Sequence, residues 1–131
     1  MRVEQITLVR NQTLAQSGSI TGRKLTAREI GKSLSSISLF LQNTGLSTSL
    51  TVTYQIGFLP PDVTQSDSNI NWLTPSDGGD IPDLTTVNIT TDNYKHKSIS
   101  LAPGEYYRFI ITENGNNTAN NVALYAQILM D

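Results

Sequence analysis

The chain has 131 residues, a formal net charge of −2 and no cysteine. Its length fits one domain with an ordinary core, and the lack of cysteine excludes disulfides and thiolate metal sites. Lysine and arginine are too few and too scattered for binding nucleic acid by phosphate neutralisation. We therefore expect a single domain over residues 1–131, with no cofactor and no nucleic-acid partner.

Alternation of apolar and polar residues dominates the sequence and predicts strands. The segment TAREIGKSL predicts at most a helical turn that ends at Gly31. Turn sequences such as NTG, PPD, PG and NG separate the strands. This pattern predicts an all-β fold, an antiparallel β-sandwich of about 7–8 strands of Greek-key or jelly-roll type. The predicted strands cover residues 3–9, 18–25, 36–43, 50–58, 97–103, 105–112 and 121–130.

Two segments of the chain share one plan, FLQNTGLSTSLTVTYQI and IITENGNNTANNVALYAQI. Each has an apolar strand, a turn with asparagine and glycine, a polar stretch, and an alternating strand with tyrosine and glutamine before isoleucine. The similarity indicates either a structural repeat or chance in a sequence rich in threonine, asparagine and leucine. Because Asn-Gly favours hairpin turns, residues 114–121 are predicted to form a polar hairpin loop.

The N-terminal segment MRVEQITLVRNQ does not have the pattern of a signal peptide, because it lacks a long apolar run and carries Glu4 early. No apolar run in the chain approaches the length of a membrane span. We expect a protein that is made in a host cytoplasm and has no membrane partner.

The sequence offers little for catalysis, and no catalytic residue is predicted. His96 is the only histidine, and it stands between two lysines without a nucleophile motif nearby. A solvated histidine in a loop before a strand explains it better than a general base.

No metal site is predicted, although three acidic residues are weak calcium candidates. Asp77, Asp80 and Asp83 follow one another at three-residue spacing in SDGGDIPD, and loop carboxylates around glycines can supply the oxygens that calcium needs. The EF-hand pattern is not matched, and a turn flanked by solubilising acids explains the same residues.

A long irregular segment, residues 60–83, is the expected place for a specialised function. It holds the only tryptophan, Trp72, with Asn71 and Asp77 nearby. An exposed indole with polar neighbours would suit a glycan platform, whereas a lone tryptophan is more often part of a core or interface. The three Asn-x-Thr sequences, at Asn11, Asn88 and Asn116, are interpreted as chance matches.

Three segments stand in an order that resembles small β-sandwich virion proteins of tailed bacteriophages and prophages. They are SLSSISLFLQNTGLSTSLTVTYQI, NWLTPSDGGDIPDLTTVNITT and SISLAPGEYYRFIITENGNNTANNVALYAQI, and together they span residues 33–130. Pro103, Gly104, Tyr106 and Arg108 match the PG-x-Y-x-R pattern of such proteins. The resemblance implies a non-enzymatic capsid decoration protein or an accessory head or tail subunit, located in the virion. Its implied partners are other virion subunits and further copies of the chain, a trimer among them.

Residues 1–12 lie outside this resemblance and are predicted to form an N-terminal arm or an edge strand. Symmetric assemblies can use such a segment to pair with a neighbouring subunit. Deleting residues 1–10 should then abolish assembly and leave a folded monomer. The interface candidates are Val3, Ile6, Leu8 and Arg10.

Two functions are therefore open from the sequence. The favoured one is a structural protein of a phage particle that acts through protein–protein contacts. The alternative is a carbohydrate-binding or adhesin-like β-sandwich module that uses Trp72 and residues 60–83.

Overall fold

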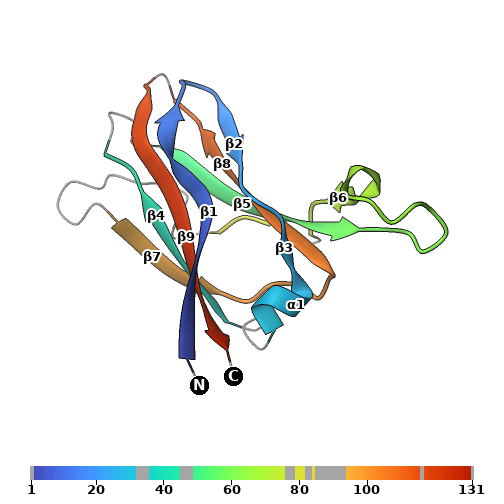
Figure 1. Cartoon of the computed structure of the whole chain (residues 1–131). Helices are drawn as coiled ribbons and strands as arrows, with labels where there is room; N and C mark the ends of the chain where they lie inside the picture. Colours follow the sequence, from blue (N-terminus) through green and yellow to red (C-terminus); the bar gives the residue numbers. More distant parts are fainter. Residues whose placement is uncertain are drawn as a thin grey trace.

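The computed structural model consists mostly of two antiparallel sheets packed face to face (Figure 1). It describes residues 2–31, 36–44, 49–75, 79–81, 84, 94–115 and 117–130. Sheet A has the order β1 (Arg2–Leu14), β9 (Ala119–Met130), β4 (Ile37–Gln42) and β7 (Tyr94–Ile99). Sheet B has the order β2 (Ser19–Thr21), β8 (Tyr106–Glu113), β5 (Leu50–Phe58) and β6 (Asn71–Leu73), with β3 (Leu25–Thr26) also paired to β8. The predicted all-β sandwich is confirmed.

The strand order identifies the sandwich as a jelly roll. β2 and β3 pair with successive stretches of β8 and so share one edge position of sheet B. The described strands then fill eight positions, which form two sheets with the orders 1-9-4-7 and 2/3-8-5-6. This interleaving is the arrangement of two Greek keys that defines a jelly roll.

The inward faces of both sheets close over a single cluster of buried apolar side chains. In β5, Leu50, Val52 and Tyr54 are buried, and the threonines between them point outward. The period-two pattern of the sequence predicted this division correctly. Tyr54 and Phe109, which are opposite one another on β5 and β8, pack within the core with ring centroids 6.2 Å apart.

The prediction of a hairpin loop over residues 114–121 is wrong, because β9 begins at Ala119 and belongs to the other sheet from β8. β8 pairs with β5 in sheet B, whereas β9 pairs with β1 and β4 in sheet A, so the chain crosses between sheets here. The chain makes the same change of sheet between β4 and β5. The two similar sequence segments are therefore two crossings that lie side by side, with β4 beside β9 and β5 beside β8. The Asn-Gly turn signal is local, and it cannot show which partners the flanking strands take.

Several strand bounds differ from those predicted. The predicted strand over residues 18–25 is split at Gly22, whose amide donates to the Phe109 carbonyl at 2.8 Å, while the next amide, that of Arg23, donates to Leu8 at 2.9 Å. A Cβ on Gly22 would lie 2.8 Å from that same Leu8 oxygen, so the close approach of β1 requires glycine.

The short elements of the chain differ from the prediction in part. β6 and the 3₁₀ turn η2 (Asp67–Asn69) lie inside the segment predicted as a loop. β7 begins at Tyr94, so His96 belongs to a strand and not to a loop before one. The helical turn is confirmed as α1 (Ala27–Ile30), and Gly31 ends it with a φ of 47°. No helix formed by the described residues is long and apolar enough to span a membrane.

Candidate functional site

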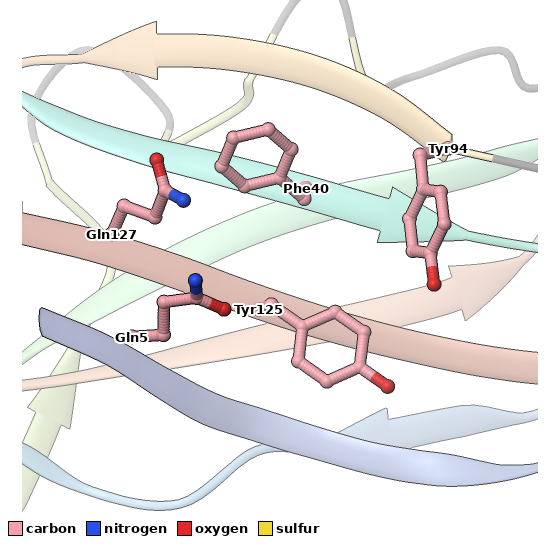
Figure 2. A pocket seen from close by; sticks show the side chains of 5 residues that line it. All are labelled: Gln5, Phe40, Tyr94, Tyr125 and Gln127. Carbon is pink, nitrogen blue, oxygen red and sulfur yellow. The ribbon is translucent and has the colours of Figure 1, made fainter. Parts of the chain in front are cut away.

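The outer face of sheet A carries a shallow pocket of aromatic and amide side chains (Figure 2). All four strands of the sheet contribute to it, and its cavity volume is about 290 Å³. Figure 2 shows the two glutamine side chains at one end, the two tyrosine rings at the other, and a phenylalanine on the strand between. The lining residues are Gln5, Phe40, Tyr94, Tyr125 and Gln127.

The strand register builds this pocket. Phe40 of β4 and Tyr125 of β9 alternate with buried residues, so both point away from the core. Phe40 is directly opposite Tyr125, and Gln5 of β1 is directly opposite Gln127. Two cross-strand pairs thus place one aromatic cluster and one amide pair next to each other on the same face.

Ring contacts hold the aromatic side chains in place. The rings of Tyr94 and Tyr125 have centroids 6.4 Å apart and planes inclined by 53°. Phe40 contacts His96 of β7, with centroids 4.8 Å apart and planes inclined by 34°. Both distances lie in the range of favourable aromatic pairs. Tyr94 nevertheless keeps 49% of its surface exposed, so much of its ring is open to a ligand.

The polar side-chain groups of the pocket form no hydrogen bonds to side chains within the described part of the chain. There, the amides of Gln5 and Gln127 and the hydroxyls of Tyr94 and Tyr125 make no hydrogen bond to another residue's side chain. Each amide offers two donors and a carbonyl acceptor, and each hydroxyl offers both functions. These groups are therefore free to bind a ligand.

None of the five residues that line the pocket carries a carboxylate, ammonium or guanidinium group. Lys95 and Lys97 of β7 are opposite Leu41 and Leu39, so they lie on the inward side of their strand. The outward positions beside the pocket are Val3, Thr7, Ser38, Gln42, His96, Ser98 and Leu129, and the imidazole of His96 is exposed.

Sequence reasoning missed this pocket. The only available signal was the large side chains at outward positions of alternating strands, Phe40 in SISLFLQN and Tyr125 in NVALYAQILM. The alternation within each strand shows that these two side chains face outward, but it cannot show that they are neighbours. They are 85 positions apart in the sequence, and only the register of β4 with β9 brings them together.

Trp72 lies on the outer face of sheet B, where its ring is already in contact with other residues. It is opposite Gly57, and the Arg108 guanidinium stacks over the indole at 4.3 Å from the ring centroid. Arg108 also donates to Gln55 through Nε at 2.7 Å, and partial burial lowers the pKa of its guanidinium. A Cβ on Gly57 would lie 3.0 Å from the indole, so the tryptophan packs closely against this glycine.

The other platform candidates do not join Trp72. Asn71 precedes it on β6 and therefore points to the opposite side of the strand, where it is exposed. Asp77 lies outside the described residues. The Trp72 platform stays a prediction, with its ring partly covered by Arg108.

Of the three calcium candidates, too, only some lie among the described residues. Asp80 is exposed and forms an isolated β-bridge with Thr53, whereas Asp77 and Asp83 lie outside the described residues. The described part of the chain contains no cluster of three histidine, aspartate or glutamate side chains that could hold a metal ion.

Comparison with known proteins shows only distant structural likeness. No protein-family model matches this sequence, and neither does any curated protein. The Yersinia pseudotuberculosis-derived mitogen shares 15% identity at a TM-score of 0.48, over 99% of this chain and 88% of the mitogen. A chain of infectious bursal disease virus, Gx strain, shares 14% identity at a TM-score of 0.36, over 97% of this chain and 32% of the viral chain. At these levels of similarity, neither protein's role transfers to this chain.

The interface candidates on β1 fall into two groups. Val3 is 58% exposed and Arg10 is also exposed, so both are accessible to a partner. Leu8 is only 3% exposed and belongs to the chain's own core, and Ile6 is packed against that core. Leu8 is therefore wrong as an interface residue, because β1 pairs with β9 and turns this side chain into the sandwich.

The PG-x-Y-x-R motif has structural roles at the start of β8. A Cβ on Gly104 would overlap with Cγ2 of Ile56, so only glycine lets this turn pack on β5. Lys24 lies over the Tyr106 ring at 5.0 Å from its centroid, and Arg108 covers Trp72. These contacts explain the motif without a ligand.

Proposed function

We propose that this protein is a non-enzymatic structural subunit of a phage particle, a capsid decoration protein or accessory head or tail subunit. It acts through contacts with copies of itself and with other virion subunits. Two points support this role. The sequence resembles virion proteins over residues 33–130, and the jelly roll is a fold of viral capsid domains, although lectins and cupins also use it.

The observation that carries the proposal is the open edge of sheet A. In the sheet formed by the described residues, β1 has a neighbour on one side only. Residues 2–7 pair with β9 in unbroken register, and the irregularities of β1 begin only after Thr7. Residues 2–7 contain no bulge, proline or lysine, three of the devices by which natural sheets protect an edge, and their charged residues are Arg2 and Glu4. A regular edge of this kind favours pairing with another chain, and the charges of Arg2 and Glu4 would have to be accommodated at that contact.

An apolar pair at the same edge strengthens this argument. Val3 and Leu129 are directly opposite on β1 and β9, and they are 58% and 41% exposed. They lie beside the adjacent chain ends (Figure 1). An isologous contact around a twofold axis would bury both pairs of side chains at once.

Truncation of the N-terminus is not a clean test of this proposal. Deleting residues 1–10 removes Leu8 and Val9 from the core, so the shortened chain should unfold instead of remaining a monomer. A better test is Val3→Lys, which places a charge on the edge without touching the core. Gln12→Lys is the matched control, because it also places a lysine at an exposed position of the same strand, within the irregular part that follows Thr7.

Sedimentation velocity over a range of concentrations measures the outcome. The wild type and Gln12→Lys should associate, and Val3→Lys should remain a monomer with an unchanged melting temperature. Assembly that survives Val3→Lys contradicts the role of the β1 edge. Mass spectrometry of particles produced from the encoding genome tests the virion assignment separately, and absence of the chain from them contradicts it.

A further inference from the structure

We propose that the pocket on the outer face of sheet A binds a short, uncharged saccharide. This inference does not rest on the virion role, because the pocket lies on the face of the sheet and the proposed assembly contact lies at its β1 edge. It also differs from the Trp72 platform, which is on the other sheet.

The aromatic rings supply the apolar half of such a site. A pyranose ring has a face of C–H groups that packs against an aromatic ring, as other apolar groups do. The rings of Tyr94 and Tyr125 are inclined by 53° with centroids 6.4 Å apart, so they form an open angle above the sheet. Phe40 forms part of the lining between them and the glutamines (Figure 2).

The amides and hydroxyls supply the polar half. A sugar hydroxyl both donates and accepts a hydrogen bond, and a glutamine amide offers both functions in one plane. Gln5 and Gln127 are direct cross-strand partners, so their amides reach the same end of the pocket. Sites for small polar ligands combine an apolar lining with a few such placed polar groups.

The lack of charged groups in the pocket lining indicates which class of saccharide it can bind. None of the five lining residues carries a carboxylate, ammonium or guanidinium group, and the imidazole of His96, which contacts Phe40, lies outside the lining. Desolvating a carboxylate or sulfate without a cationic partner is costly. The pocket therefore fits a neutral sugar and disfavours sialylated, uronic or sulfated ones.

The dimensions limit the ligand to a short saccharide. A cavity of about 290 Å³ lies near the lower end of the usual range for small-molecule sites, roughly 300–1,000 Å³. A shallow site on a sheet face leaves much of the ligand in solvent, so we expect weak binding by a single copy. An assembly that carries many copies would bind a polysaccharide more tightly through multivalency.

The test uses the full chain in native affinity electrophoresis, with gels that contain a neutral glucan, mannan or galactan, or an anionic polygalacturonate. At least one of the neutral polysaccharides should retard the wild type. Retardation in the polygalacturonate gel but in none of the neutral gels is not expected. Tyr94→Ala and Gln5→Ala should each weaken retention, with the tyrosine change costing about ten-fold in affinity. Both positions are on edge strands and exposed, so the fold should survive.

Two controls make the result specific to the pocket. Phe58→Ala removes an exposed aromatic ring outside it, 54% of which is open to solvent, and should leave retention unchanged. In two-dimensional NMR spectra with an oligosaccharide of the retaining polymer, the side-chain amide signals of Gln5 and Gln127 should shift, whereas that of Gln55 should not.

Several results would overturn the proposal. These are no retardation in any of the neutral polymers, retention by the anionic polymer only, retention that Tyr94→Ala leaves intact, or equal losses in Tyr94→Ala and Phe58→Ala. Self-association of the wild type that Tyr94→Ala abolishes would show instead that a second copy of the chain covers the pocket.

Discussion

The side chain of Asn121 donates a hydrogen bond to the Thr44 hydroxyl at 2.6 Å, and this contact joins the two segments that cross between the sheets. The backbone adds a second link, because the Thr44 amide donates to the Asn120 carbonyl at 3.0 Å. On the other sheet, the Asn114 amide donates to the Ser49 carbonyl at 3.0 Å. The asparagine-rich stretch thus forms hydrogen bonds that connect the end of β8 and the start of β9 to the chain between β4 and β5.

Two substitutions of Asn121 should separate the contribution of its hydrogen bond to stability from the contribution of its backbone conformation. Its φ of 52° lies in the left-handed region, which asparagine and glycine tolerate better than alanine. Asn121→Gly loses only the hydrogen bond and should cost about 1 kcal/mol in the free energy of unfolding. Asn121→Ala should cost about 1 kcal/mol more, because it adds strain at positive φ. Urea denaturation of both variants measures the difference.

The contact with Thr44 can be isolated with a double-mutant cycle. Thr44→Ala removes the acceptor, so Asn121→Gly should cost less in that background than in the wild type. If the two changes are strictly additive, the side-chain contact contributes nothing to stability. If glycine and alanine at position 121 cost the same, backbone strain is not the reason.

The hydroxyl of Tyr107 should stabilise the start of β8. This side chain is fully buried, and its hydroxyl donates to the Ala102 carbonyl at 2.6 Å, with the Gly104 carbonyl at 3.2 Å. Tyr107→Phe removes the donor from these part-buried acceptors and should lower the free energy of unfolding by about 1–3 kcal/mol.

Tyr106→Phe is the matched control for this change. The neighbouring side chain points outward and is only half-buried, and its change should stay within about 0.5 kcal/mol. Thermal melting of both variants gives the comparison, and equal effects would contradict a special role for the Tyr107 hydroxyl.

The sequence could predict the fold class because its strands are regular. In β8, Tyr107, Phe109 and Ile111 are buried and the residues between them are not, which is the alternation visible in EYYRFIIT. It could not predict that β8 and β9 belong to different sheets, because pairing depends on partners far along the chain. β6 was missed because a strand of three residues is too short to show a period.

The arrangement of the pocket on the outer face of sheet A depends even more on the pairing of strands that are far apart in the sequence. Gln5 and Gln127 lie at opposite ends of the sequence and become neighbours only because β1 and β9 pair near both chain ends. Trp72 attracted attention as the only tryptophan, yet its partner Arg108 belongs to a strand that β5 separates from β6. The sequence shows which side chains face outward, and only the sheet order shows which of them meet.

Acid should weaken the turn that begins α1, because Glu29 holds it together as a carboxylate. One of its oxygens accepts a hydrogen bond from the Thr26 amide at 3.0 Å, and the other pairs with Arg23 at 2.8 Å. Burial raises the pKa of this carboxyl, but the hydrogen bonds from Arg23 and Thr26 outweigh it. The pKa therefore lies below its ordinary value of 4.5.

A pKa that is lower in the folded state means that the stabilisation is present above about pH 4.5 and is lost as the pH falls through the folded-state value. Other carboxylates also respond to acid, so the comparison is with Glu29→Gln, which has the same shape and does not ionise. The wild type should melt at a higher temperature than this variant at pH 7, and the difference should shrink steadily toward pH 3. A difference that stays constant over this range would mean that packing, and not the charge of Glu29, stabilises the turn.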